Sequence, residues 1–172
     1  MVDYLKTQKI IHWLMAIIIM LDLNVAQKFG GNMELWDRLE SRVDHATAGL
    51  IVTFLFILRM VLRYRYGAPA LPSDMPIWQI LAAKMGHYGL YLLMGLLILS
   101  GIVTASFASD PIIVFGALDL VISPNEKFFT LVRVVHEFCT NAIIALIFIH
   151  ILAALYHHFY AKDDTTLKML KF

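Results

Sequence analysis

Four long apolar stretches constrain this chain more than any other feature of its sequence. They lie near residues 8–28, 44–64, 78–107 and 127–160. A helix needs about 20 mostly apolar residues to cross the hydrocarbon core of a bilayer, and each stretch approaches or exceeds that length. Of all residues 60% are hydrophobic and 16% are charged, whereas soluble domains average roughly 45–50% and about 25%. The sequence predicts an all-α membrane protein, a four-helix transmembrane bundle in which residues 1–172 form a single domain.

The connections between the four stretches have the composition of turns and loops. Residues 30–44 begin with two glycines and continue with many charged side chains, and residues 68–76 contain three prolines. Both compositions are typical of turns. Residues 109–125 are less polar, and we expect a short interfacial helix there. The first apolar stretch lacks a small-residue cleavage pattern after it, so we expect a retained helix.

The basic residues predict how the bundle is oriented. With four spans, the N-terminus, the 65–77 loop and the C-terminus share one side, which carries nine of the fourteen Lys and Arg residues and four of the thirteen acidic ones. Cytoplasmic flanks carry an excess of Lys and Arg. We therefore expect both termini in the cytoplasm. The outer side has five basic and nine acidic residues, a net charge of −4.

The charge and cysteine content exclude several classes of protein. A formal net charge of +1 gives no basic surface of the kind that binds nucleic acid. Cys139 is the only cysteine, so the chain cannot hold a disulfide framework, or on its own an iron–sulfur cluster or a cysteine-built zinc site. The sequence contains no C-x-x-C-H motif, which excludes covalently attached c-type haem.

Histidines are the most informative polar residues. Of the seven in the chain, five lie inside or at the edge of the predicted spans: His12, His45, His87, His136 and His150. An ionisable side chain in hydrocarbon is costly without a partner and therefore indicates a functional site. One membrane histidine is often only an interhelical hydrogen-bonding residue, but this explanation is insufficient for five.

The histidine spacing predicts two pairs at two depths. His136 and His150 are 14 residues apart, just under four helical turns, so they share a face about 21 Å apart along the axis, too far for one metal ion. In an antiparallel bundle His45 lies at the level of His136, and His12 at the level of His150. Two such bis-imidazole sites are what two b-type haems require.

Motifs built around these histidines follow one another along the four spans. They are His12-Trp13, His45-x-x-x-Gly49, His87, His136-Glu137 and His150-x-x-Ala153-Ala154-x-x-His157-His158. In this order, and over essentially the whole chain, they resemble the bacterial cytochrome b561 family. The resemblance implies a di-haem b protein of the bacterial inner membrane that exchanges electrons with the quinone pool. The type it resembles most is the superoxide oxidase, a superoxide:ubiquinone oxidoreductase.

The resemblance also implies which residues hold the cofactors. His12 and His150 correspond to the axial ligands of an inner haem, and His45 and His136 to those of an outer haem. Once the two pairs are made, His87 has no obvious histidine opposite it, and with His157 it lies toward the cytoplasmic side. Either could hydrogen-bond a quinone carbonyl or relay a proton during quinone reduction, or simply be satisfied by a backbone carbonyl or a haem propionate.

Two other functions remain open from the sequence. The first is a cytochrome b membrane-anchor subunit that links a partner dehydrogenase or hydrogenase to quinone. The second is a haem-free transporter or channel with histidines along its pore, which does not explain the paired depths. Superoxide is an anion, and the net negative charge of the outer side does not favour its capture.

Overall fold

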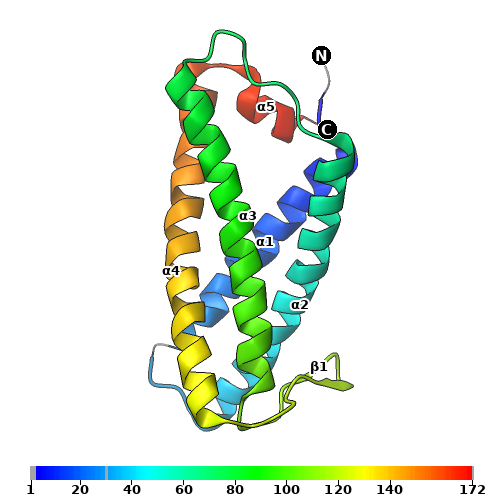
Figure 1. Cartoon of the computed structure of the whole chain (residues 1–172), viewed down its shortest axis with the longest axis vertical. Helices are drawn as coiled ribbons and strands as arrows, with labels where there is room; N and C mark the ends of the chain where they lie inside the picture. Colours follow the sequence, from blue (N-terminus) through cyan, green and yellow to red (C-terminus); the bar gives the residue numbers. More distant parts are fainter. Residues whose placement is uncertain (1–2, 30, 172) are drawn as a thin grey trace.

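A computed structural model describes residues 3–29 and 31–171 of the chain (Figure 1). Four long helices cross the molecule: α1 (Lys6–Lys28), α2 (Leu35–Tyr66), α3 (Ile77–Ser106) and α4 (Glu126–Leu155). A π-helical turn, η1 (Tyr156–Ala161), continues α4, and a short helix, α5 (Asp164–Leu170), follows it. All four long helices are long and apolar enough to cross a membrane. The predicted four-helix transmembrane bundle is confirmed.

Helix α2 begins at Leu35, well before the predicted start at residue 44. The charged segment that follows Glu34 is therefore helical, and the prediction of a turn there is wrong. Asp37 lies in the first turn of α2, where a carboxylate interacts favourably with the helix dipole. Hydropathy identifies only the part of a helix that lies in hydrocarbon, so it gives no signal for a polar extension beyond the bilayer.

The connection between α3 and α4 contains a small antiparallel hairpin of strands β1 (Ile113–Val114) and β2 (Leu118–Asp119). Phe115 and Gly116 form its turn with φ angles of 52° and 68°. Val114 is fully buried among side chains that include residues of α2. The prediction of an interfacial helix is therefore wrong, because the apolar residues of this connection pack against the bundle as strands.

The helices pack as two hairpins. Close backbone contacts are concentrated between α1 and α2 and between α3 and α4, and are far fewer between the two hairpins. A core cluster of Ile11, Met15, Val52 and Leu55 holds α1 against α2. Only 6–11% of the residues in the most apolar window of each span are buried. Side chains therefore leave much of the bundle's apolar surface uncovered, as expected of helices that face lipid or a bound cofactor.

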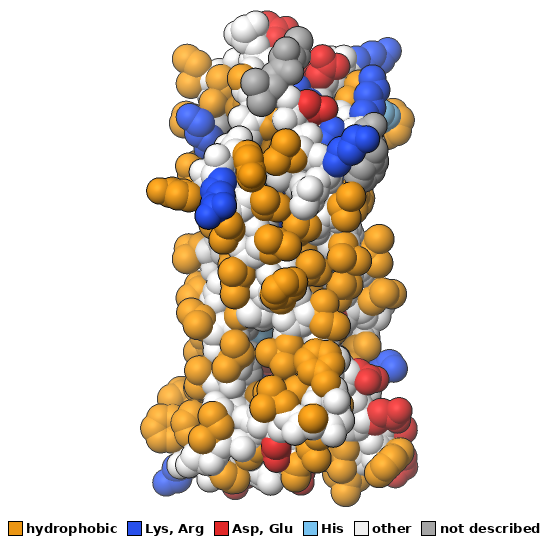
Figure 2. Space-filling model, turned by 90° about the vertical axis from the view of Figure 1, so that its right-hand side faces the viewer, with side chains coloured by type: hydrophobic (Ala, Val, Ile, Leu, Met, Phe, Trp, Pro, Cys, Tyr) orange, Lys and Arg blue, Asp and Glu red, His pale blue; other side chains and the backbone are white. Residues whose placement is uncertain are grey.

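Charge is distributed along the long axis of the molecule. Figure 2 shows a broad hydrophobic band between polar ends, with Lys and Arg concentrated at the upper end and Asp and Glu at the lower end. Both ends of the chain lie at the upper, basic end (Figure 1). This arrangement has the form of a protein that crosses a bilayer four times.

Helix α5 covers the basic end of the bundle. The indole Nε1 of Trp13 in α1 donates a hydrogen bond of 3.0 Å to the carbonyl oxygen of Met169. The Lys168 ammonium donates to the carbonyl oxygen of Ala70 at 2.8 Å, in the loop between α2 and α3. These bonds connect the C-terminal segment to α1 and to the loop between the two helical hairpins.

Candidate functional site

Two pairs of histidines meet across the two helical hairpins. The rings of His45 in α2 and His136 in α4 have their centres 6.1 Å apart, with an angle of 77° between their planes. The rings of His12 in α1 and His150 in α4 are 6.3 Å apart at 83°. The structure thus brings together the pairs expected from the spacing. We call His45 and His136 the outer pair, and His12 and His150 the inner pair.

The ring separations fit a shared haem iron. An imidazole nitrogen lies about 2 Å from a bound metal and its ring centre about 1 Å further, so two opposed rings on one metal have centres about 6 Å apart. The separations of 6.1 and 6.3 Å agree with that value. Among the described residues no group of three or more His, Cys, Asp or Glu side chains could hold a metal ion. A haem needs only two protein ligands, because the porphyrin supplies four nitrogens.

Hydrogen bonds orient both rings of the outer pair. The Nδ1 atom of His45 lies 2.8 Å from a carboxylate oxygen of Asp22 in α1. The Nδ1 atom of His136 lies 2.9 Å from the hydroxyl of Ser100 in α3, which donates to the carbonyl of Leu97 at 3.1 Å. The Asp22 carboxylate accepts a hydrogen bond from Nδ1–H of His45, and the Ser100 hydroxyl, whose own proton goes to Leu97, accepts one from Nδ1–H of His136. In each ring this leaves Nε2 with a lone pair for a metal.

Sequence reasoning did not identify Asp22 or Ser100. Asp22 gives a signal, since it is the only carboxylate in the first apolar stretch, and an intramembrane charge indicates function by default. Ser100 gives none, because a serine in a membrane helix commonly bonds to its own backbone.

Gly101 brings the backbone of α3 against the outer pair. A Cβ atom built at this position would lie 3.1 Å from Cε1 of His136. A Cβ at Gly49 or Gly95 would meet no atom within 4 Å. Gly101 is therefore the glycine that allows the imidazole of His136 to approach its neighbouring helix.

His87 lies beside the inner pair. Its ring centre is 5.7 Å from that of His150, and its Nδ1 atom is 2.7 Å from the carbonyl oxygen of Ala83. The histidine beside His87 is thus His150, which is already a member of the inner pair. The spacing of histidines along the fourth span could not show this, because it does not determine how α3 is rotated against α4.

His157 lies in the π-helical turn. Its Nδ1 atom is 2.6 Å from a carboxylate oxygen of Asp163, and no ring contact with His87 occurs among the described residues. Burial by itself would raise the pKa of Asp163, but hydrogen bonds from Thr165 and His157 hold it below its ordinary value of 3.8. The structure thus places His157 at the junction between α4 and the C-terminal helix.

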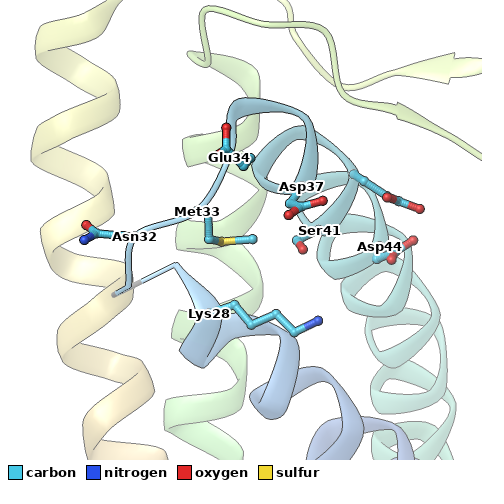
Figure 3. A pocket seen from close by; sticks show the side chains of 8 residues that line it. Lys28, Asn32, Met33, Glu34, Asp37, Ser41 and Asp44 are labelled. Atoms are coloured by element: carbon cyan, nitrogen blue, oxygen red, sulfur yellow. The ribbon is translucent and has the colours of Figure 1, made fainter.

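A pocket opens at the acidic end, between the end of α1 and the start of α2 (Figure 3). Its volume is about 810 Å³. The lining side chains are mostly polar: Lys28, Asn32, Met33, Glu34, Asp37, Glu40, Ser41 and Asp44. Four carboxylates and one ammonium give it a negative charge, and its last residue, Asp44, directly precedes His45. The pocket is therefore an acidic surface at the start of α2.

Comparison with known proteins shows the family. The sequence pattern of prokaryotic cytochrome b561 matches residues 3–172. The chain belongs to this family. Members are membrane electron-transfer proteins, and the family implies haem b binding. The resemblance noted from the histidine motifs is thereby confirmed, and the protein is a bacterial multi-pass membrane protein.

Three relatives cover nearly the whole chain. Cytochrome b561 homolog 1 of Escherichia coli (strain K12) is 29% identical over 170 residues, covering 96% of this chain and 95% of the relative. Cytochrome b561 homolog 2 of the same strain is 30% identical over 164 residues, covering 92% and 86%. A probable superoxide oxidase CybB of Yersinia pestis is 27% identical over 167 residues, covering 93% and 91%.

Proposed function

We propose that this cytochrome b561 is a superoxide:ubiquinone oxidoreductase. Two superoxide anions would be oxidised to O₂ at the outer side, and one ubiquinone would be reduced with two protons at the inner side. The observation that carries the proposal is the presence of two histidine pairs with ring separations suited to one iron each. Similarity to a probable superoxide oxidase supports the choice of donor.

The four paired histidines would hold two b haems. His45 and His136 are the proposed ligands of the outer haem iron, and His12 and His150 those of the inner haem iron. When bound, b haems supply one-electron transfer. The protein's part would be to hold the two rings of each pair close together, and Gly101 leaves room for the imidazole of His136.

His87 and His157 are the proposed residues for quinone and proton handling. Quinone reduction consumes protons, and imidazole exchanges them near neutral pH. His87 is exposed on α3 beside the inner pair, so its Nε2 atom is available to a quinone carbonyl. His157 contacts Asp163, which gives it a carboxylate partner for proton transfer.

The acidic pocket favours a second candidate function. Its four carboxylates repel a small anion such as superoxide and attract a positively charged partner. The protein would then be a cytochrome b anchor subunit that receives electrons from a partner dehydrogenase or hydrogenase and passes them to quinone.

Reduction of the purified protein by superoxide separates the two candidates. We expect about two haems per chain with the sharp α-bands of bis-histidine ligation, reduced by a superoxide flux and reoxidised by a soluble ubiquinone. The His136→Ala and His150→Ala variants should each retain about one haem, while His158→Ala, outside both pairs, retains two. Haems that superoxide leaves oxidised, but that a partner protein reduces, would establish the anchor function instead. Full haem content in His136→Ala or His150→Ala would contradict the ligand assignment.

A further inference from the structure

Asp22 is a carboxylate inside a membrane-spanning helix. Its side chain is 16% exposed, and His45 at 2.8 Å is its one ion-pair partner among residues 3–29 and 31–171. A carboxylate in this position is costly, and proteins retain it where it serves a partner. Asp22 also lies in α1, whereas both members of the outer pair belong to other helices. Helix α1 thus contributes to the outer site through Asp22, in addition to α2, α3 and α4.

The hydrogen bond determines which nitrogen of His45 is free to bind a metal. An ionised carboxylate can only accept hydrogen bonds, so the Nδ1–H group of His45 donates to Asp22 and the Nε2 lone pair is free for a metal. A carboxylate behind an imidazole increases the electron density that the ring donates to its metal. This effect stabilises the more positive, oxidised iron, and second-shell hydrogen bonding is one of the means by which proteins set haem potentials.

The two histidine pairs differ in this respect. His136 has the neutral hydroxyl of Ser100 as its Nδ1 partner. Within the described part of the chain, neither His12 nor His150 has a carboxylate partner, and the neighbouring His87 bonds to a backbone carbonyl. The charge-assisted contact therefore occurs at the outer pair and has no counterpart at the inner pair.

We propose that Asp22 is a positioning residue that lowers the reduction potential of the outer haem relative to the inner one. Electron flow from the outer side to the inner side is then favoured by the protein itself, whichever donor delivers the electrons. This inference rests on the proposed ligation of the outer haem by His45 and His136. It goes beyond that assignment, because it gives a direction to transfer between the two centres.

The test is a redox titration of the complete, haem-loaded protein and its Asp22→Asn variant. The outer transition is identified as the one lost in His45→Ala. In Asp22→Asn we expect the ferric–ferrous equilibrium of this haem to shift about tenfold toward the ferrous form. This shift raises its reduction potential by about 59 mV for one electron. The inner transition should stay in place.

Two further variants keep the test decisive. Asp44→Asn makes the same chemical change at an exposed carboxylate next to His45 in sequence, and we expect it to leave the outer transition within about twofold of the parent. Asp22→Ser removes the charge but keeps a hydroxyl acceptor for Nδ1 of His45. We therefore expect the reduction potential of its outer haem to rise as in Asp22→Asn. If Asp22→Asn fails to bind haem, Asp22→Ser provides the measurement.

The outcomes separate this inference from the proposed ligation. An unchanged outer potential in a haem-loaded Asp22 variant, or an equal rise in Asp44→Asn, would overturn the role of Asp22 while leaving the histidine assignment intact. A parent protein with a single haem transition would contradict the ligation itself. A rise confined to the Asp22 variants supports the inference.

Discussion

Gly101 sets how closely the outer imidazole of α4 can approach α3. A Cβ atom at this position would lie 3.1 Å from Cε1 of His136, closer than an ordinary van der Waals contact. The ring cannot move away freely, because its Nδ1 atom is bonded to Ser100. A single methyl group at residue 101 would therefore displace His136, one of the histidines proposed to hold the outer haem.

We predict that Gly101→Ala weakens outer haem binding. Overpacking of this kind costs about 1–3 kcal/mol, which corresponds to an affinity loss of roughly fivefold to more than a hundredfold. Haem content and the α-band of the purified variant measure the effect. Gly86→Ala is the matched control on the same helix, since a Cβ there meets no atom within 4 Å. Equal haem loss in both variants would show that any methyl group added to α3 weakens haem binding, whether or not it contacts His136.

At the scale of secondary structure elements, the C-terminal helix α5 is held at its start by Asp163. This carboxylate accepts from the backbone N–H of Thr165 at 2.8 Å and lies 2.6 Å from Nδ1 of His157. The pKa of Asp163 is lowered in the folded protein, where the hydrogen bonds from Thr165 and His157 outweigh the opposing effect of burial. A group with a lowered pKa stabilises the fold at pH above its unfolded value of 3.8, and this stabilisation is lost as the pH falls through the folded value.

We predict that α5 detaches from the bundle as the pH falls below the ordinary carboxyl pKa of 3.8, and that Asp163→Asn loosens it at neutral pH. Loss of a hydrogen-bonded charge at this site should speed proteolysis of the C-terminal segment by about threefold to tenfold. Trp13 fluorescence reports the same event, because its indole donates to Met169 in α5. Asp164→Asn, one residue further on and exposed, should have a smaller effect. If neither proteolysis of the C-terminal segment nor Trp13 fluorescence changes in acid, Asp163 does not hold α5 against the bundle.

The sequence was sufficient to predict the four spans and the two histidine pairs, because both depend on regular patterns. Apolar length identifies a span, and 14 residues between His136 and His150 give one helical face. The start of α2 and the β1–β2 hairpin were not predicted, because they depend on contacts with other elements. Val114 illustrates this, since its complete burial comes from packing outside its own segment.

At the scale of the whole molecule, the two ends differ in charge, with both termini at the basic end (Figures 1 and 2). Positive flanks remain in the cytoplasm during insertion. Orientation therefore depends on the sum of many surface residues, not on one motif.

We predict that a fluorescent protein fused after residue 172 is fluorescent in cells, and that alkaline phosphatase fused there is inactive. The reverse is expected for fusions in the β1–β2 connection, at the opposite end of the bundle. Replacing Arg63 and Arg65 with uncharged residues, and introducing two arginines on the outer side, should give a mixture of molecules in the two orientations. An active phosphatase at the C-terminus would place the acidic pocket in the cytoplasm and reverse the proposed direction of electron flow.

Helix α4 contributes one ring to each histidine pair. The distance between the two centres therefore depends on the rise of one continuous helix, about 21 Å over its 14 intervening steps, and not on any loop. Electron tunnelling slows exponentially with separation, so a rigid spacer between the two proposed haem sites would keep the transfer rate constant while loops at either end fluctuate. Inserting one residue between His136 and His150 would turn one ring about 100° from its partner, so a change of length in this stretch would break one of the two pairs.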